Sequence, residues 1–222
     1  MPVPQGAPVV RRHLLRDEAY EALSDAIVSG QLRPGEQLHD AELCAWLNLS
    51  RSPVRAALAR LEDEGLIETA PQRSTRVTTL ESSRVLDGFP VLAALHALAT
   101  ELAVPRLARE ELERLRAENR ALIGAVAAGN GGAAYTADER FHAVLVGAAG
   151  NQELSRALAR LAPGLRRLAR VGGLAAPGRR SVAQHEAIIE RAAAGDAARA
   201  AAATRENWLE LGAVARRALA GA

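Results

Sequence analysis

Asp138 and His142 stand four residues apart in the segment "DERFH", and a second histidine, His185, follows later in "HEAII". Residues four apart lie on one face of a helix, and apolar neighbours such as Phe141 and Ile188 direct both segments toward a core. One carboxylate and two imidazoles that point into the same core could hold a divalent ion such as Zn²⁺, because both ligand types suit that metal. The spacing alone also fits an ordinary hydrogen-bonded Asp–His pair.

The segments that would position these side chains are predicted to be helical. Hydrophobic residues make up 49% of the chain and aromatic residues 3%, so its core must consist of Ala, Leu and Val, and Ala and Leu favour helices. The apolar pattern, broken by Gly and Pro, predicts a bundle over residues 81–222 and a mostly α protein. We expect helices over 82–104, 109–128, 133–149, 153–171 with an interruption at Pro163-Gly164, 179–194, and from 197 to the end.

Residues 13–80 have a different organisation. A helix over 17–29 ends at Gly30, a turn at Pro34-Gly35 follows, and a short helix starts at Asp40. In the third helix we expect Ser52 to be the cap and Pro53 the first helical residue. The runs "LIETA" and "TRVTT" then predict a hairpin, so the whole segment is predicted to be a winged helix-turn-helix, preceded by a flexible tail over 1–12.

Basic and hydroxyl side chains gather at the start of the third helix and on the hairpin, where they could meet phosphates and base edges of DNA. The alternative is that a capped amphipathic helix and a hairpin form only a small folded unit. We predict DNA contacts from Arg33, Ser50, Arg51, Ser52, Arg55, Arg73 and Arg76.

The charge balance requires any DNA-binding surface to be local. The net charge of the chain is +2, and residues 1–80 hold 9 Arg against 11 acidic residues. Cys44 has no partner for an internal disulfide, which predicts a cytoplasmic protein. The apolar run over 90–104 is short and contains His96 and Glu101, so we expect no membrane span.

The segments "YEALSDAIVSGQLRPGEQL" and "LSRSPVRAALARLEDEGL" resemble the amino-terminal domain of the GntR family of bacterial transcription regulators. The resemblance implies a dimeric repressor or activator that reads a short two-fold symmetric operator, with Arg51 and Arg55 at bases or nearby phosphates. The wing tip of this family usually carries a glycine where the chain has Ser74-Thr75.

"DERFH" before "GAAGN", and "HEAII" before "GD", resemble the ligand-binding FCD domain of the FadR-type GntR regulators. This resemblance implies metal ligation by Asp138, His142 and His185, with a fourth ligand position where the chain has Asn207 instead of histidine. The usual "RxxxE" pattern of the first bundle helix appears as Leu92 and His96, which weakens the case for a clamp on an effector carboxylate. His96 and Arg140 are our candidates for a ligand pocket, although His96 also fits a core histidine.

The favoured function is a homodimeric transcription regulator whose affinity for an operator is controlled by a small, carboxylate-type metabolite bound in the bundle at a weak divalent-metal site. One alternative is a FadR-type regulator with a metal-free pocket. The other is a metal-dependent hydrolase with a DNA-binding appendage, which is disfavoured because no paired general base accompanies Asp138 and His142. Double-stranded DNA and a small effector are the expected partners, and a membrane is not.

Overall fold

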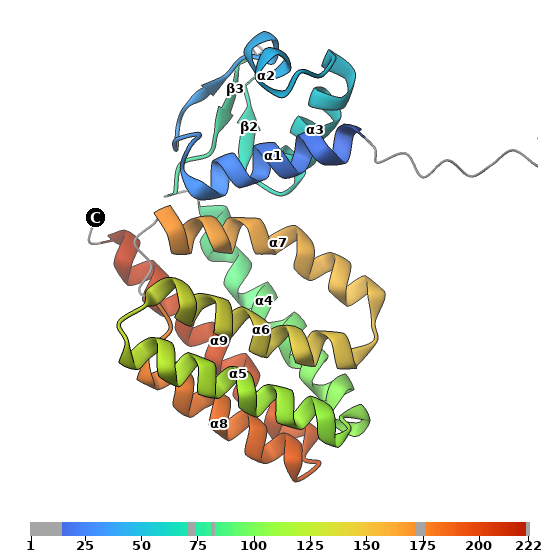
Figure 1. The fold of residues 1–222 in the computed structure, drawn as a ribbon, viewed down its shortest axis with the longest axis vertical. Coiled ribbons are helices and arrows are strands. Elements are labelled where there is room, and N and C mark those ends of the chain that lie inside the picture. The colour runs from blue at the N-terminus through green and yellow to red at the C-terminus, as the bar shows by residue number, and fades with distance from the viewer. Residues whose placement is uncertain (1–14, 71–73, 81–82, 172–175, 221–222) are drawn as a thin grey trace, which may run out of the picture.

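The computed structural model describes residues 15–70, 74–80, 83–171 and 176–220 of the 222-residue chain. The helices and strands form a small amino-terminal unit above a larger helical bundle (Figure 1). The predicted tail over 1–12 lies outside the described residues.

The amino-terminal unit is a winged helix-turn-helix, as predicted from the sequence. Its elements are α1 (Leu15–Ser29), β1 (Gln37–Leu38), α2 (Asp40–Leu47), α3 (Arg51–Asp63), β2 (Ile67–Thr69) and β3 (Thr75–Val77). The strands form an antiparallel sheet in the order β1-β3-β2, in which Arg76 is paired with Glu68 on one side and Gln37 on the other. Strand β1 was not predicted, because two residues after a turn are too few to show an alternating pattern.

The core of this unit follows the apolar faces of its helices. Leu23 and Ile27 of α1 pack with Val54 and Leu61 of α3, and all four side chains are fully buried. The i, i+4 spacing in α1 and the i, i+7 spacing in α3 place each pair on one helical face. This packing holds α3 with its opposite, polar face outward.

Among the described residues of the bundle, every regular element is a helix, as predicted. Its elements are α4 (Ser83–Ala103), the 3₁₀ turn η1 (Val104–Arg106), α5 (Arg109–Ala127), α6 (Gly131–Ala149), α7 (Gln152–Val171), α8 (Arg179–Ala193) and α9 (Ala197–Ala220). Helix α4 packs against α9, α6 and α7, and α5 packs against α6 and α8. The core contains Phe89, Phe141, Leu145, Leu168 and Ile188.

Helix α7 runs without interruption through Pro163, so the predicted break at Pro163-Gly164 is wrong. A proline inside a helix removes one backbone hydrogen bond and normally destabilises the helix. Here Pro163 is itself buried, and the apolar stripe continues through it from Leu158 to Leu165. Contacts with α1 on one side and α4 on the other offset the local cost.

Residues Val85–Arg106 are long and apolar enough to cross a membrane by length and composition alone, with a mean hydropathy of 1.4 in their most apolar window. A helix that packs in the core of a bundle passes the same test. In the structure this segment forms α4 and η1, and α4 packs against three other helices, with 39% of its most apolar window buried.

A buried arginine of α7 joins the two units. Arg167 is 1% exposed; its Nη1 donates to Thr78 Oγ1 over 2.8 Å and its Nη2 donates to the Thr78 carbonyl oxygen. The Thr78 hydroxyl also lies 3.0 Å from the carbonyl oxygen of Gly65, which follows α3. Burial lowers the pKa of Arg167 to about 10, so the guanidinium remains charged at neutral pH. The bundle is therefore anchored where β3 ends and just beyond the end of α3.

Candidate metal centre and DNA-binding surface

Helices α6 and α8 bring together the three residues whose spacing suggested a metal site. Helix α6 begins after Asn130, whose side chain accepts from the Ala133 N–H, and it ends at Gly150 in the left-handed conformation. Asp138 and His142 occupy its inward face, and both are at least nine-tenths buried. His185 is fully buried on α8.

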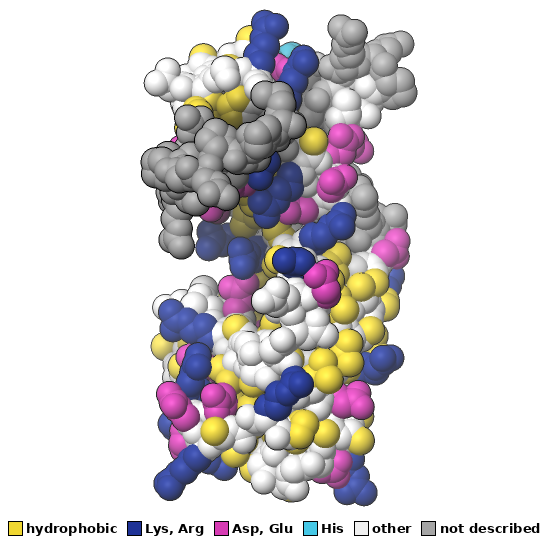
Figure 2. All heavy atoms as spheres, turned by 90° about the vertical axis from the view of Figure 1, so that its right-hand side faces the viewer, with side chains coloured by type: hydrophobic (Ala, Val, Ile, Leu, Met, Phe, Trp, Pro, Cys, Tyr) yellow, Lys and Arg dark blue, Asp and Glu magenta, His cyan; other side chains and the backbone are white. Residues whose placement is uncertain are grey.

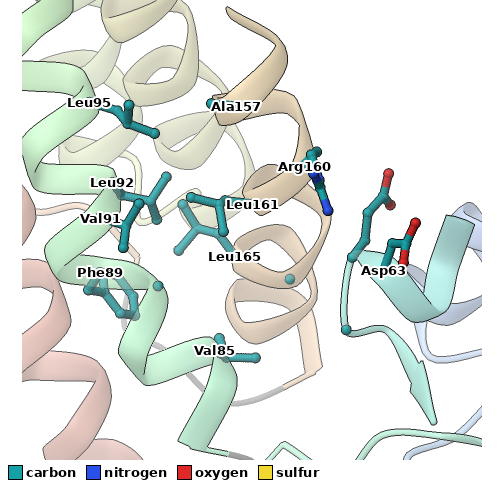
Figure 3. A pocket seen from close by; sticks show the side chains of 14 residues that line it. Asp63, Val85, Phe89, Val91, Leu92, Leu95, Ala157, Arg160, Leu161 and Leu165 are labelled. Atoms are coloured by element: carbon teal, nitrogen blue, oxygen red, sulfur yellow. The ribbon is translucent and has the colours of Figure 1, made fainter. Parts of the chain in front are cut away.

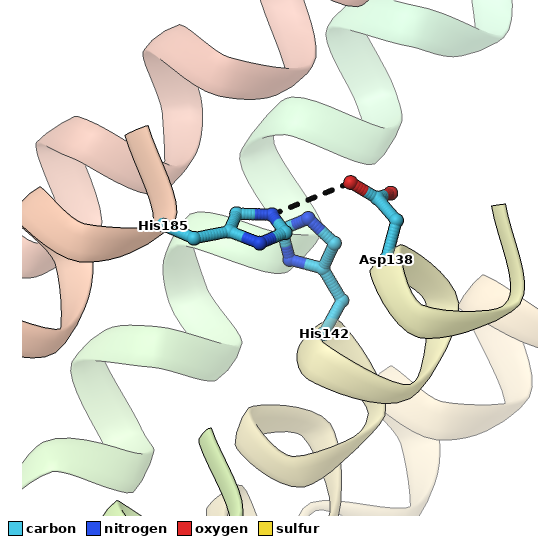
Figure 4. Close-up of side chains that lie close together, drawn as sticks. All are labelled: Asp138, His142 and His185. Atoms are coloured by element: carbon cyan, nitrogen blue, oxygen red, sulfur yellow. Dashed lines mark ion pairs between the residues drawn. The ribbon is translucent and has the colours of Figure 1, made fainter. Parts of the chain in front are cut away.

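The three side chains point toward one another (Figure 4). One ligand atom from each lies within 4.8 Å of the others, and His185 Nε2 is 3.4 Å from Asp138 Oδ1. The ring of Phe141 stacks on His185 with 3.7 Å between centroids and 6° between planes. This stacking restricts the plane of the His185 imidazole, whose Nε2 faces Asp138.

The polar atoms of the cluster fit a divalent ion. His142 Nδ1 and both ring nitrogens of His185 are buried and make no hydrogen bond to any described residue. A buried nitrogen without a partner costs free energy, and a bound cation would satisfy the unprotonated nitrogen of each ring. Burial lowers the pKa of His142 to about 4, against a smaller opposing effect from Asp138. At neutral pH this imidazole is therefore uncharged, which is the form that ligates metals.

Asn207 and His96 also lie close to His142. Asn207, on α9, is buried and lies in hydrogen-bond contact with His142. His96, on α4, stacks on Trp208 with 4.2 Å between centroids, and its ring centroid is 5.2 Å from that of His142. Burial lowers the pKa of His96 well below its usual value. His96 thus lies in the aromatic wall of the site and outside the group of three that can share one ion.

The structure does not bring Arg140 to the cluster. Arg140 is exposed, whereas Asp138 and His142 on the same helix are buried. Two residues along a helix correspond to a rotation of about 200°, so a side chain midway between two inward residues points outward. Arg140 therefore lies on the outer face of α6, away from the Asp138/His142/His185 cluster.

Helix α3 begins earlier than predicted. Ser50 is its N-cap, with the extended backbone angles φ −72° and ψ 167°, and Arg51 is the first helical residue. Pro53 is therefore the third helical residue instead of the first, a position whose N–H would have no partner inside the helix in any case. Ser50 and Ser52 can both serve as caps by residue type, which is why the sequence did not discriminate between them.

The amino-terminal end of α3 is open to solvent. Ser50, Arg51 and Ser52 are all exposed. Arg55, whose side chain is 69% exposed, lies in the second turn and its Nε is 2.8 Å from Asp40 Oδ2 on α2. This ion pair holds Arg55 beside the first turn of α2, and its remaining guanidinium nitrogens are available to a phosphate or a base edge.

The other residues predicted to contact DNA are at the edges of the unit. Arg33, in the turn before β1, and Arg76, in β3, are both exposed. Arg73 lies outside the described residues. On the face drawn in Figure 2, basic and acidic side chains are interspersed over both units, in keeping with a local patch instead of a field of one sign.

A cavity that the sequence did not reveal lies where the bundle meets the amino-terminal unit (Figure 3). It measures about 360 Å³ and is lined mainly by apolar side chains of α4 and α7, including Phe89, Leu92 and Leu161. Asp63 and Glu64, at the end of α3, and Arg160 of α7 also line it. Its apolar residues belong to ordinary core stripes, which give no signal of a cavity.

A winged helix-turn-helix is an architecture of DNA-binding proteins, and here it is joined to a helical bundle with a buried Asp/His cluster. Residues 15–77 match the family described as "Bacterial regulatory proteins, gntR family", and residues 87–209, more than half of the chain, match the FCD domain. The chain therefore belongs to the GntR family, in the FadR-like group that carries a C-terminal FCD domain.

Curated relatives share this family. The chain is 36% identical over 129 residues to the Nta operon transcriptional regulator of Aminobacter aminovorans, a match that covers 57% of this chain and 60% of that protein. It is 28% identical over 101 residues to the HTH-type transcriptional repressor RspR of Escherichia coli, covering 46% and 44% of the two chains. The matched part thus spans less than two thirds of these relatives. They are transcriptional regulators and not enzymes, which argues against the hydrolase alternative.

Solved structures show the same fold. The E. coli protein McbR/YncC superposes with a TM-score of 0.71 at 20% identity, covering 91% of this chain and 97% of that one. A GntR family regulator from Pseudomonas syringae superposes with a TM-score of 0.52 at 23% identity, covering 94% and 89%. At these identities the likeness concerns the fold alone.

Proposed function

We propose that the chain is a cytoplasmic transcription regulator that binds a two-fold symmetric DNA operator as a homodimer. The observation that carries the proposal is the exposed start of α3, where Arg51 and two serines surround a helix N-terminus in a winged unit. Backbone N–H groups at such an end attract phosphates, and arginine reads guanine in the major groove. The family match supports this assignment.

Two copies are proposed because one amino-terminal unit has little long-range attraction for DNA. Its arginines are outnumbered by acidic residues, so affinity must come from specific contacts made twice, by two recognition helices one turn of DNA apart.

We further propose that Asp138, His142 and His185 hold a divalent ion such as Zn²⁺, with Asn207 at the position of a fourth, weaker ligand. When bound, the ion supplies a Lewis-acidic centre that attracts an anionic group such as a carboxylate. The support is the set of buried imidazole nitrogens without hydrogen-bond partners among the described residues. The alternative is a metal-free pocket around His96, His142 and His185.

The path from this site to the DNA-binding unit is proposed to run through α7. Arg166 of α7 is ion-paired to Glu139, the neighbour of Asp138 on α6, with 2.9 Å between Nε and Oε1. The next residue, Arg167, bonds to Thr78 at the end of the wing. A ligand that shifts α6 would thus act on α7 and, through Arg167, on the wing and the recognition helix.

Selection of bound duplexes from a random pool tests the proposal. We expect enrichment of a two-fold symmetric sequence whose half-sites lie about one helical turn apart, and loss of enrichment with Arg51→Ala. The matched control is Arg114→Ala, an exposed arginine of α5. Enrichment of no sequence, or of the same sequence by Arg51→Ala, would contradict the proposed DNA-binding surface.

A further inference from the structure

Four side chains of α8 and α9 form a continuous chain of polar contacts from the protein surface to the Asp/His cluster. At the outer end, Arg180 is ion-paired to one carboxylate oxygen of Glu210. Gln184 Nε2 donates to the other oxygen of Glu210 over 2.7 Å. At the inner end, Asn207 Nδ2 donates to Gln184 Oε1 over 2.9 Å. Asn207 is the member that contacts His142.

The hydrogen bonds in this series of side chains all run in one direction, because the carboxylate at the outer end can only accept. A carboxylate paired with arginine can only accept hydrogen bonds, so Gln184 must turn its NH₂ group toward Glu210. The oxygen of Gln184 then faces Asn207, which must turn its own NH₂ group toward Gln184. Because the two polar atoms of an amide lie on opposite sides of its carbon, Asn207 Oδ1 is left for the other side, where His142 lies.

We propose that Gln184 and Glu210 are positioning residues that fix the amide of Asn207 with its oxygen, and not its NH₂ group, toward the Asp138/His142/His185 cluster. The inference rests on the proposed metal site, and it explains how an asparagine can serve there. Rotation of the amide by about 180° replaces the oxygen, which can ligate a cation, with an NH₂ group, which cannot. An asparagine ligand therefore needs a neighbouring group that sets its orientation. Such outer partners commonly change metal affinity by about 10–100-fold.

A double-mutant cycle on the full chain tests the inference, with Zn²⁺ affinity measured by competition with a chelator. Gln184→Met removes the acceptor for Asn207 and should weaken Zn²⁺ binding at least about tenfold. In an Asn207→Asp background the same change should alter affinity less than about twofold, because a carboxylate presents oxygen in either orientation. Gln152→Met, at an exposed glutamine of α7, is the matched control. Equal losses in both backgrounds, or no loss in the parent background, would overturn the inference.

A measurement without metal tests the orientation independently. The side-chain ¹⁵N–¹H₂ resonances of Asn207 are identified by their disappearance in Asn207→Asp. We expect slow hydrogen exchange of this NH₂ group in the parent protein and faster exchange with a shifted resonance in Gln184→Met. An unchanged resonance overturns the inference. If the parent binds no Zn²⁺, the proposed metal site fails, and the resonance alone decides whether the amide is oriented as inferred.

Discussion

At the scale of single residues, burial determines the chemistry of the site. His142 is enclosed by α4, α6, α8 and α9, and its low pKa follows mainly from that burial. A neutral imidazole and the adjacent Asp138 carboxylate provide ligands without an unpaired positive charge in the core. In the proposed ligand set Asn207 is the weak member, because a neutral amide oxygen is a poorer zinc ligand than an imidazole.

Replacement of Asn207 by histidine should therefore strengthen the site. Asn207→His is expected to tighten Zn²⁺ binding at least about tenfold, whereas His185→Ala should abolish the binding that exists. Titration against a competing chelator measures both effects, and circular dichroism checks that the helices remain folded. An Asn207→His protein that binds no more tightly than the parent would favour a metal-free pocket around His96, His142 and His185.

The low pKa of His142 also predicts a pH dependence of stability in the metal-free protein. In the unfolded chain this histidine has an ordinary pKa near 6.5, while the folded value is about 4. Between these values the unfolded chain binds the extra proton, so the free energy of unfolding falls as pH falls from 6.5 toward 4, by about 1.4 kcal/mol per unit at most. His96 acts in the same direction.

Urea unfolding in a chelating buffer at pH 7 and pH 4.5 measures this dependence. His142→Gln should lose less stability than the parent between the two pH values, because glutamine does not titrate. Equal losses in the two proteins would show that His142 is not held neutral by burial.

Among the elements, α3 is the one that we propose to contact DNA. Arg55→Ala is expected to weaken binding to a selected operator by about 1–3 kcal/mol and to relax its sequence preference if Arg55 reads a base. Arg73→Ala should weaken binding to all sequences alike if Arg73 contacts phosphates as predicted from the sequence, because phosphate contacts carry no sequence information. Fluorescence anisotropy at moderate salt measures both, and parent-like affinity in both variants would contradict the docking orientation.

Much of the fold could be predicted from the sequence because apolar residues recur at helical spacing, as Val54, Leu58 and Leu61 do in α3. The continuity of α7 could not be predicted from the sequence, because contacts with other elements decide whether Pro163 breaks the helix. Asp138, His142 and His185, which the structure brings together, were found from their types and spacing. Gln184 and Glu210 were not predicted to take part in the site. In the sequence each is an ordinary helix-surface residue, and only the packing of α8 against α9 brings them together.

At the scale of the whole molecule, Arg167 is the main polar link between the bundle and the DNA-binding unit. It is buried, and no carboxylate among the described residues pairs with it, so its hydrogen bonds to Thr78 are its specific compensation. The two tryptophans report on the two units separately, since Trp46 lies in α2 and Trp208 in α9.

Arg167→Met should leave both units folded but separate their unfolding transitions. Fluorescence of Trp46→Phe and Trp208→Phe proteins during thermal unfolding measures each unit separately. The transition of the winged unit is expected to shift downward in Arg167→Met and to remain in place in the control Arg156→Met, an exposed arginine of the same helix. Equal shifts in both units, or none, would contradict the role of Arg167 as a link.

Sedimentation of the chain with and without its selected operator tests whether two copies bind one operator. We expect two 23.4 kDa chains per operator, one amino-terminal unit on each half-site, with half-sites about 34–36 Å apart, and a homodimer at micromolar concentration before DNA is added. A chain that sediments only as a monomer of 23.4 kDa, alone and on the operator, would contradict it.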